Sequence, residues 1–170
     1  MRTYFLPILL SAFFLACSET EKKKTFSKKG VFFICPEGWK ITDEDTIEGG
    51  GQSVTLENKD FTGSGLISIN WVKDSMEMES WYTSFQESFK DNPIYSSVDL
   101  TFNKSIETKY KDYPGILGTY QFRILNVHHD GKFYLVYGKD KTVNILLQEA
   151  EEDHRENEQG FFEFKKSLKL

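Results

Sequence analysis

Cysteine is scarce in this chain of 170 residues, which contains only Cys17 and Cys35. If Cys17 carries a covalent attachment, no intrachain disulfide can form, even in an oxidising compartment. Cys35 lies in the apolar run VFFIC and is expected to pack as a small buried hydrophobic side chain. A hydrolytic function based on Cys35 would need the opposite arrangement, an exposed thiol beside a histidine.

Positive charge is also in short supply, because 21 lysines and arginines stand against 26 aspartates and glutamates. The net charge is −5, and the lysines cluster only in residues 18–30. A nucleic-acid-binding surface needs a clustered basic face that neutralises phosphates, so we expect no nucleic-acid partner. After residue 16, no segment is long and apolar enough to cross a membrane.

Motifs of nucleophilic and nucleotide chemistry are absent. There is no Gly-x-Ser-x-Gly elbow, and the GSG at residues 63–65 is expected to be a turn between strands. The three glycines at 49–51 lack the spacing and the lysine of a phosphate-binding loop. We therefore expect a protein that is not an enzyme and that has no catalytic residues and no cofactor.

Two short stretches carry residues that metals accept as ligands. The first has imidazole and carboxylate groups, with a distant third nitrogen: His128, His129, Asp130 and His154. Neighbouring residues on a strand point to opposite faces, which favours an exposed hairpin end over a metal site. The second offers oxygen ligands for calcium: Asp43, Glu44, Asp45 and Glu48. It lacks the spacing of an EF-hand loop, so a solvated loop is expected and no metal is assigned.

The first sixteen residues have the features of a targeting signal. Arg2 precedes a run of about a dozen mainly apolar residues, FLPILLSAFFLA, which is shorter than the roughly 20 residues that span a bilayer. The run ends in Phe14, Leu15 and Ala16, directly before Cys17. This arrangement resembles the lipobox of bacterial lipoprotein signal peptides, in which a small residue precedes the cysteine.

That resemblance implies cleavage of residues 1–16 and a lipid on Cys17, which is the one site residue assigned. An ordinary cleaved signal and an uncleaved anchor are the alternatives. Ser18 resembles the outer-membrane default of lipoprotein sorting. Residues 17–30 contain one aromatic residue and five lysines, too few apolar groups to form a core, and they are predicted to be a flexible lipidated tether.

Residues 31–170 are predicted to form a single domain, because about 140 residues with many aromatics can build one core. Alternating apolar residues predict strands over 31–35, from Trp39 onward, over 53–58 and over 65–72, with a flexible loop over 43–52. A helix is predicted from Asp74, with Glu77 completing a capping box, and it ends before Pro93. An apolar stripe would bury one side of this helix: Met78, Trp81, Tyr82, Phe85 and Phe89.

The second half of the domain is predicted to be an antiparallel meander. Strands are expected over 98–102, 106–110, 115–128, 132–138 and 142–150. Asp130-Gly131 is a typical hairpin turn and is predicted to join the two longer strands. A final helix over 156–170 would turn its aromatic side to the sheet. The fold class is therefore α+β, an antiparallel sheet covered by helices.

Two short motifs lie at the ends of this domain. The opening motif consists of Pro36, Gly38 and Trp39. The closing motif lies in the last helix and consists of Phe161, Phe164, Ser167 and Leu168. Together they resemble the motifs of the PsbP/Mog/DcrB-like sandwich family, over residues 30–170, and the resemblance implies an antiparallel sheet covered by helices. Members have unrelated roles, so no catalytic or binding residue is carried over.

The leading functional hypothesis is a membrane-anchored, non-enzymatic lipoprotein of the bacterial cell envelope, more specifically of the outer membrane. It would act as a protein-interaction or accessory module, with the membrane and one unidentified protein as partners. The alternative is a lipoprotein that binds a small ligand or metal in a pocket between sheet and helix. A large apolar cavity would favour this alternative. A filled core with exposed aromatic side chains would favour a protein partner.

Overall fold

The computed structural model describes residues 24–58, 64–73 and 77–170. Within them, eight antiparallel strands form one sheet in the order β3-β4-β5-β10-β9-β8-β6, with β7 also paired to β8, and β1 and β2 form a separate hairpin. The strands are β1 (Thr25–Lys28), β2 (Val31–Ile34), β3 (Trp39–Ile47), β4 (Gly51–Asn58), β5 (Leu66–Val72), β6 (Thr101–Phe102), β7 (Ile106–Tyr110), β8 (Tyr113–Ile124), β9 (Val127–Tyr137) and β10 (Thr142–Ala150). The helices are α1 (Met78–Asp91) and α2 (His154–Ser167), and short 3-10 turns occupy Glu48–Gly50 and Glu151–Asp153. This confirms the predicted α+β class.

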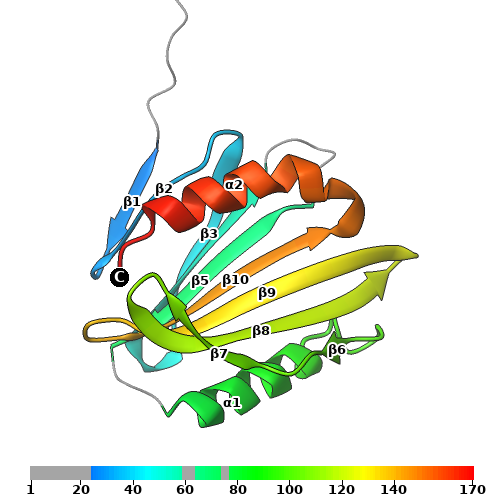
Figure 1. The fold of residues 1–170 in the computed structure, drawn as a ribbon, viewed down its shortest axis with the longest axis horizontal. Coiled ribbons are helices and arrows are strands. Elements are labelled where there is room, and N and C mark those ends of the chain that lie inside the picture. The colour runs from blue at the N-terminus through cyan, green and yellow to red at the C-terminus, as the bar shows by residue number, and fades with distance from the viewer. Residues whose placement is uncertain (1–23, 59–63, 74–76) are drawn as a thin grey trace, which may run out of the picture.

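The two helices lie on opposite faces of the sheet (Figure 1). On one face, α2 and the β1–β2 hairpin enclose a core in which Phe164 is fully buried and meets Phe33 edge-on at 5.4 Å between ring centroids. Trp39 packs on the same helix, 5.5 Å from the Phe161 ring. Gly160 permits this approach, because a Cβ there would lie 2.1 Å from the Trp39 indole nitrogen. The aromatic residues near the C-terminus, Phe161 and Phe164, therefore pack α2 against the rest of the domain.

The apolar stripe of α1 covers the other face, as predicted. Phe85 packs on Phe133 with ring centroids 4.5 Å apart, and Phe89 packs on Tyr120 at 4.9 Å. The predicted capping box is wrong in one respect. Glu77 is itself the N-cap, and its carboxylate accepts hydrogen bonds from the backbone of Glu79 and Ser80. Asp74, the predicted cap, lies outside the described residues.

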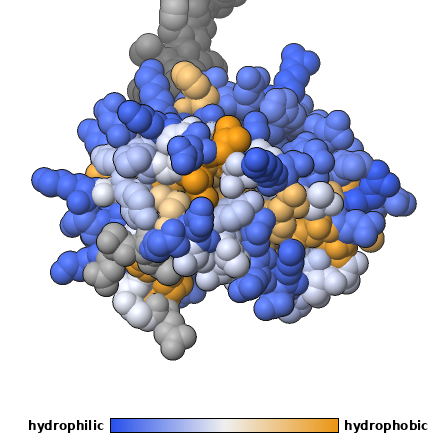
Figure 2. Space-filling model, turned by 60° about the horizontal axis from the view of Figure 1, so that its bottom comes forward, coloured by the Kyte–Doolittle hydropathy of each residue, from blue (hydrophilic) through white to orange (hydrophobic). Residues whose placement is uncertain are grey.

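Outside α1, this face carries only scattered apolar side chains. Figure 2 views the molecule from the α1 side and shows hydrophobic residues at the surface in small groups separated by hydrophilic ones.

Over all faces of the molecule, five large apolar side chains among the described residues are well exposed: Ile47, Ile94, Ile106, Leu125 and Phe162. In the described part of the chain, no helix is long and apolar enough to span a membrane.

The predicted turn at Asp130-Gly131 is wrong. β8 and β9 are joined instead at Leu125 and Asn126, which both have positive φ, and Asp130 and Gly131 lie inside β9. Gly131 is opposite Tyr120 across the ladder, and a Cβ at Gly131 would lie 2.0 Å from a carbon of the Tyr120 ring. The glycine is thus needed for packing under an aromatic ring, not for a turn.

Three further predictions are corrected by the strands. The flexible loop expected over 43–52 is mostly strand, since β3 continues to Ile47, β4 starts at Gly51, and only Glu48–Gly50 turn. The tether expected over 17–30 ends early, because Thr25–Lys28 pair with β2. Phe26 is the physical reason. Its ring is buried, stacked on Phe33 at 4.8 Å. The strand expected over 98–102 is reduced to Thr101–Phe102.

Candidate functional site

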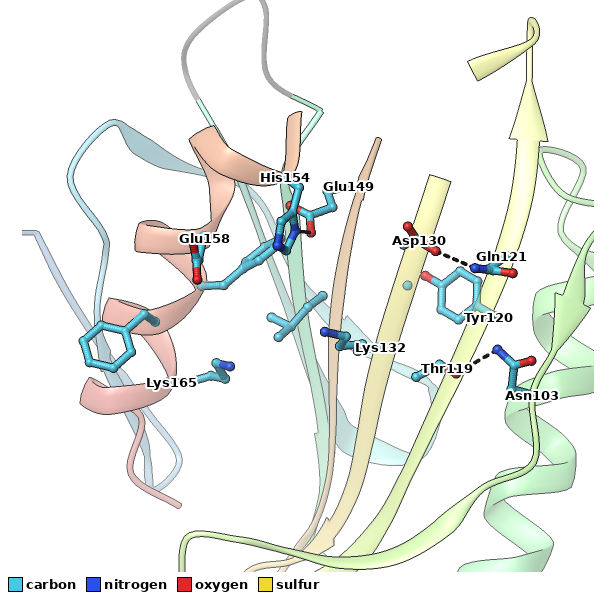
Figure 3. Close-up of a pocket in the computed structure, with 14 residues that line it drawn as sticks. Asn103, Thr119, Tyr120, Gln121, Asp130, Lys132, Glu149, His154, Glu158 and Lys165 are labelled. Atoms are coloured by element: carbon cyan, nitrogen blue, oxygen red, sulfur yellow. Dashed lines mark hydrogen bonds and ion pairs between the residues drawn. The ribbon is translucent and has the colours of Figure 1, made fainter. Parts of the chain in front are cut away.

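A groove of about 510 Å³ runs between α2 and the neighbouring strands β8, β9 and β10 (Figure 3). Its volume lies within the range of roughly 300–1,000 Å³ that is usual for small-molecule binding sites. The strands form its floor and α2 one wall. The side chains that give it its chemistry are Thr119, Gln121, Asp130, Lys132, Leu147, Glu149, His154, Glu158, Phe161, Phe162 and Lys165.

Strand register builds the floor in two rows across the sheet. In one row, Lys132 of β9 is opposite Thr119 of β8 and Leu147 of β10. In the next row, Asp130 of β9 is opposite Gln121 and Glu149. Alternate residues of a strand share a face, so both rows point to α2. The wall residues recur at helical spacing from His154 to Lys165, which places them along one stripe of α2.

Two lysines define a basic end of the groove. Lys132 extends from β9 and Lys165 from α2, and their ammonium groups point toward one another across the groove (Figure 3). Neither has an ion-pair partner among the described residues. Glu158 of α2 also lines the groove, but it forms no ion pair with either lysine, so two like charges that face each other leave this end complementary to an anionic group.

Two carboxylates define the acidic end. Asp130 and Glu149 are directly opposite each other on adjacent strands, an arrangement that is unfavourable for like charges. Gln121 donates to Asp130 at 2.9 Å. Glu149 is only 8% exposed, and its Oε1 lies 2.6 Å from Nδ1 of His154. Its Oε2 is buried with no hydrogen-bond partner among the described residues.

The carboxylate of Glu149 changes the pKa of His154. The hydrogen bond to Glu149 raises the pKa of the His154 imidazole above its ordinary value, and the negative charge of Glu149 acts in the same direction. The protonated imidazole is therefore favoured, and it neutralises part of the charge of the buried carboxylate. Among the residues that the structure describes, one oxygen of Glu149 has no hydrogen-bond partner and the carboxylate of Asp130 forms no ion pair.

The groove is equipped to bind charged groups, and its lining offers no activated nucleophile. The Thr119 hydroxyl accepts a hydrogen bond from Asn103 at 2.9 Å. The Tyr120 hydroxyl donates to Gln148 at 2.7 Å, and burial raises its pKa well above the ordinary value. Neither hydroxyl contacts a histidine or a carboxylate that could take its proton in the way general-base catalysis requires.

The histidine-rich stretch that suggested a metal site is dispersed. His128 lies beside Arg123, whereas the His129 ring stacks on Phe122 at 4.8 Å. Both are in β9, next to the turn at Leu125 and Asn126 and not at the predicted Asp130-Gly131 turn. Asp130 and His154 belong to the groove. No three or more ligand-type residues in the described parts of the chain are placed to hold a metal ion.

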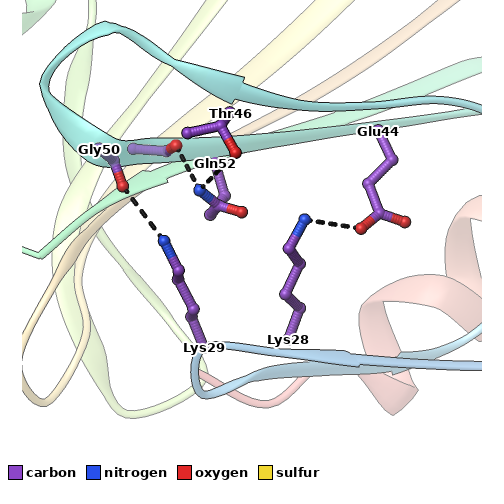
Figure 4. Close-up of polar contacts among 7 residues, drawn as sticks. Lys28, Lys29, Glu44, Thr46, Gly50 and Gln52 are labelled. Carbon is purple, nitrogen blue, oxygen red and sulfur yellow. Dashed lines mark hydrogen bonds and ion pairs between the residues drawn. The ribbon is translucent and has the colours of Figure 1, made fainter.

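The acidic stretch is dispersed in the same way. Asp43, Glu44 and Asp45 are consecutive residues of the edge strand β3, so they point alternately to opposite faces. Glu44 pairs with Lys28 of the hairpin at 2.7 Å (Figure 4). The Glu48 backbone lies in the turn after β3, and its side chain lies outside the description. Charges on an edge strand discourage pairing with another sheet, which gives these acids a structural role.

Cys35 is buried, as predicted. Its side chain is 5% exposed, and the thiol donates to the Trp39 carbonyl at 3.3 Å. The hydrolytic reading needed an exposed thiol beside a histidine and is therefore wrong. Cys17 lies outside the described residues, so its lipidation stays a prediction.

Comparison with known proteins identifies the fold. No protein-family model and no curated protein matches the sequence. The cyanobacterial PsbP (CyanoP) of Synechocystis sp. PCC 6803 superimposes with a TM-score of 0.58 at 12% identity, over 91% of this chain and 97% of that one. LpqN, involved in cell envelope biogenesis of Mycobacterium tuberculosis, gives a TM-score of 0.51 at 6% identity, over 88% and 91%. At such identities the likeness concerns the fold alone, and the chain has a PsbP-like fold.

Proposed function

We propose that this protein is a membrane-anchored, non-enzymatic lipoprotein of the bacterial cell envelope, and that it acts by binding another protein in the groove between α2 and the sheet. The observation that carries the proposal is the groove itself. It is open, charged at both ends and lacks an activated nucleophile, while the core beneath it is filled by buried side chains. Small-molecule pockets are usually more apolar and bury most of their ligand.

An exposed aromatic side chain at the rim supports a protein partner. Phe162 is 55% exposed on α2, next to Phe161, which is only 8% exposed and packs on the sheet. Aromatic residues are enriched where proteins bind one another, because they bury a large area on contact. A partner in the groove would cover Phe162 and reach the unpaired lysines.

The cellular location is proposed on separate grounds. The lipobox-like end of residues 14–17 implies a lipid on Cys17, and Ser18 favours the outer membrane. LpqN, which shares the fold, is a protein of cell envelope biogenesis. Several acyl chains on one cysteine would hold the domain at the membrane far more firmly than a single chain, which binds only marginally.

Site-specific photocrosslinking in cells tests the proposal. A photoreactive amino acid replaces Phe162, and in a control protein it replaces Ser84, an exposed residue of α1 on the opposite face. We expect one reproducible protein adduct from position 162, none from position 84, and loss of the adduct in a Lys132→Glu, Lys165→Glu variant. Identical adducts at both positions would overturn the proposal. So would native mass spectrometry that finds only a small molecule or a metal bound to the wild-type protein.

A further inference from the structure

The groove has two carboxylates at one end and two lysines at the other, and binding of a partner does not by itself require this separation of charge. We propose that the groove holds an extended segment of the partner in which a basic and an acidic side chain are two residues apart, the basic one at Asp130 and Glu149 and the acidic one between Lys132 and Lys165. This inference rests on the proposed function, because it specifies what the partner presents to the groove.

The acidic end calls for a cationic donor. Asp130 and Glu149 are directly opposite each other on adjacent strands, and the side chain of Glu149 is only 11% exposed. A buried carboxylate oxygen without a hydrogen bond is costly, and His154 satisfies only the other oxygen. An ammonium or guanidinium group would reduce the repulsion and supply donors to both carboxylates.

The basic end calls for an acceptor. The ammonium group of Lys132 extends from the floor and that of Lys165 from the α2 wall, and neither is paired within the described residues. A carboxylate between them would accept from both and screen their repulsion. The side chain of Leu147 forms the floor beside Lys132, so the charges lie next to an apolar surface from which water is partly excluded.

The distance between the two ends matches one kind of ligand. Lys132 and Asp130 are two residues apart on β9, and the rows that contain them are therefore separated by roughly 6.6–6.8 Å, the rise of two strand residues. An extended peptide repeats its side chains on one face at the same interval. A basic and an acidic residue at positions i and i+2 thus face the two ends together. Either order of the two fits, because a peptide can enter the groove in either direction.

Peptide binding to the mature full-length protein in detergent tests the inference. The probes are short fluorescent peptides that share a serine- and threonine-rich frame and carry Lys-x-Glu, Glu-x-Lys, Lys-x-Lys, Glu-x-Glu or Gln-x-Gln, plus one with Lys and Glu four residues apart. Fluorescence anisotropy should show one of the two opposite-charge peptides with i,i+2 spacing binding roughly tenfold tighter than the others.

A charge reversal makes the test specific. Lys132→Glu turns most of the groove acidic, so the opposite-charge peptide should lose its advantage and Lys-x-Lys should become the best ligand. Lys139→Glu, an exposed residue in the turn between β9 and β10, changes the net charge equally and should leave the ranking unchanged. Circular dichroism would verify that both variants remain folded.

Three results would overturn the inference: affinity that follows net charge alone, a preference for the four-residue spacing, or an unchanged ranking in Lys132→Glu. A crosslinked partner at position 162 together with any of these results would leave the proposed function intact. If the groove prefers the peptide with i,i+2 opposite charges but no protein is crosslinked in cells, the inferred specificity of the groove would be supported. The proposed protein partner would then be rejected.

Discussion

At the scale of single residues, the turn between β8 and β9 is unusual. A two-residue hairpin turn with positive φ at both positions normally contains Asn-Gly or Asp-Gly. Here Leu125 has φ of 50° and Asn126 has φ of 69°. The left-handed conformation costs roughly 1–2 kcal/mol for a residue with a Cβ, and Leu125 recovers nothing by burial because it is 92% exposed.

Replacing Leu125 by asparagine should therefore stabilise the protein. We expect the free energy of unfolding, measured by urea titration, to rise by about 0.5–1 kcal/mol, since asparagine adopts this conformation more readily. Leu125→Ala is the matched control. It removes the same exposed apolar surface but keeps the backbone strain, so it should give no increase. An equal gain in both variants would contradict the backbone explanation.

At the scale of secondary-structure elements, α2 is held by its inward aromatic residues. Phe164 is fully buried against Phe33, whereas Phe162, two positions before it, is exposed at the groove. Phe164→Ala should lower the free energy of unfolding by about 3–5 kcal/mol, because it leaves a cavity in the core. Phe162→Ala should leave stability almost unchanged in the same urea titration. An equal loss of unfolding free energy in the two variants would show that the Phe164 side of α2 is not the side that packs in the core.

A second connection between elements depends on pH. His154 of α2 and Glu149 of β10 form a pair in which the carboxylate raises the pKa of the imidazole above 6.5. Because the folded pKa is the higher one, this pair stabilises the fold fully below about pH 6.5, and the contribution is lost as the pH rises through the folded pKa.

The stability difference between wild type and His154→Gln should therefore be largest near about pH 6 and vanish near about pH 9. Urea titrations at a series of pH values measure it. In a Glu149→Gln background, the pH dependence of the His154→Gln effect should disappear, because the partner of the imidazole is gone. A His154→Gln effect that is the same at both pH values would contradict the ion pair.

Local patterns predicted most elements, and the failures have physical causes. Alternation found β2, β4 and β5, and the aromatic stripe found α1, because each of these elements has one buried side. The prediction of β10 was also correct, although this strand is buried on both faces. The Asp130-Gly131 turn was wrong, because the glycine makes room for Tyr120, which is remote along the chain and adjacent only through β8–β9 pairing. The acids of β3 resemble a loop, because this edge strand is exposed there.

The candidate site was less accessible to sequence analysis than the fold. Asp130 and His154 were noticed as ligand-type residues, but Lys132, Glu149 and Lys165 were not. Their significance comes from strand register, which sets Glu149 opposite Asp130, and from the packing of α2, which brings Lys165 toward Lys132. Neither is encoded in a local motif. A pocket between sheet and helix was weighed only in general terms, without any of its residues.

At the scale of the whole molecule, the proposed attachment to a membrane depends on one residue. Cys17→Ser should abolish metabolic labelling with a radioactive or clickable fatty acid and move the protein from the membrane fraction to a soluble or unprocessed form. Cys35→Ser is the matched control and should retain the label, because the Cys35 side chain is buried in the folded domain. Unchanged labelling of Cys17→Ser would refute the lipobox.

If the domain is anchored through Cys17 as proposed, the β1–β2 hairpin would determine how it responds to a pull on the anchor. Tension from the N-terminal side would act first on the pair Thr25–Ile34, the open end of the ladder, and would separate the remaining pairs one after another. Backbone hydrogen bonds between Phe32 and Lys169 would still hold β2. Release of residues 25–30 would lengthen the connection by roughly 20 Å. A pull on the anchor would thus separate β1 and expose the buried Phe26 ring before it strained the groove, and burial of this ring would favour re-formation of the hairpin when the load ended.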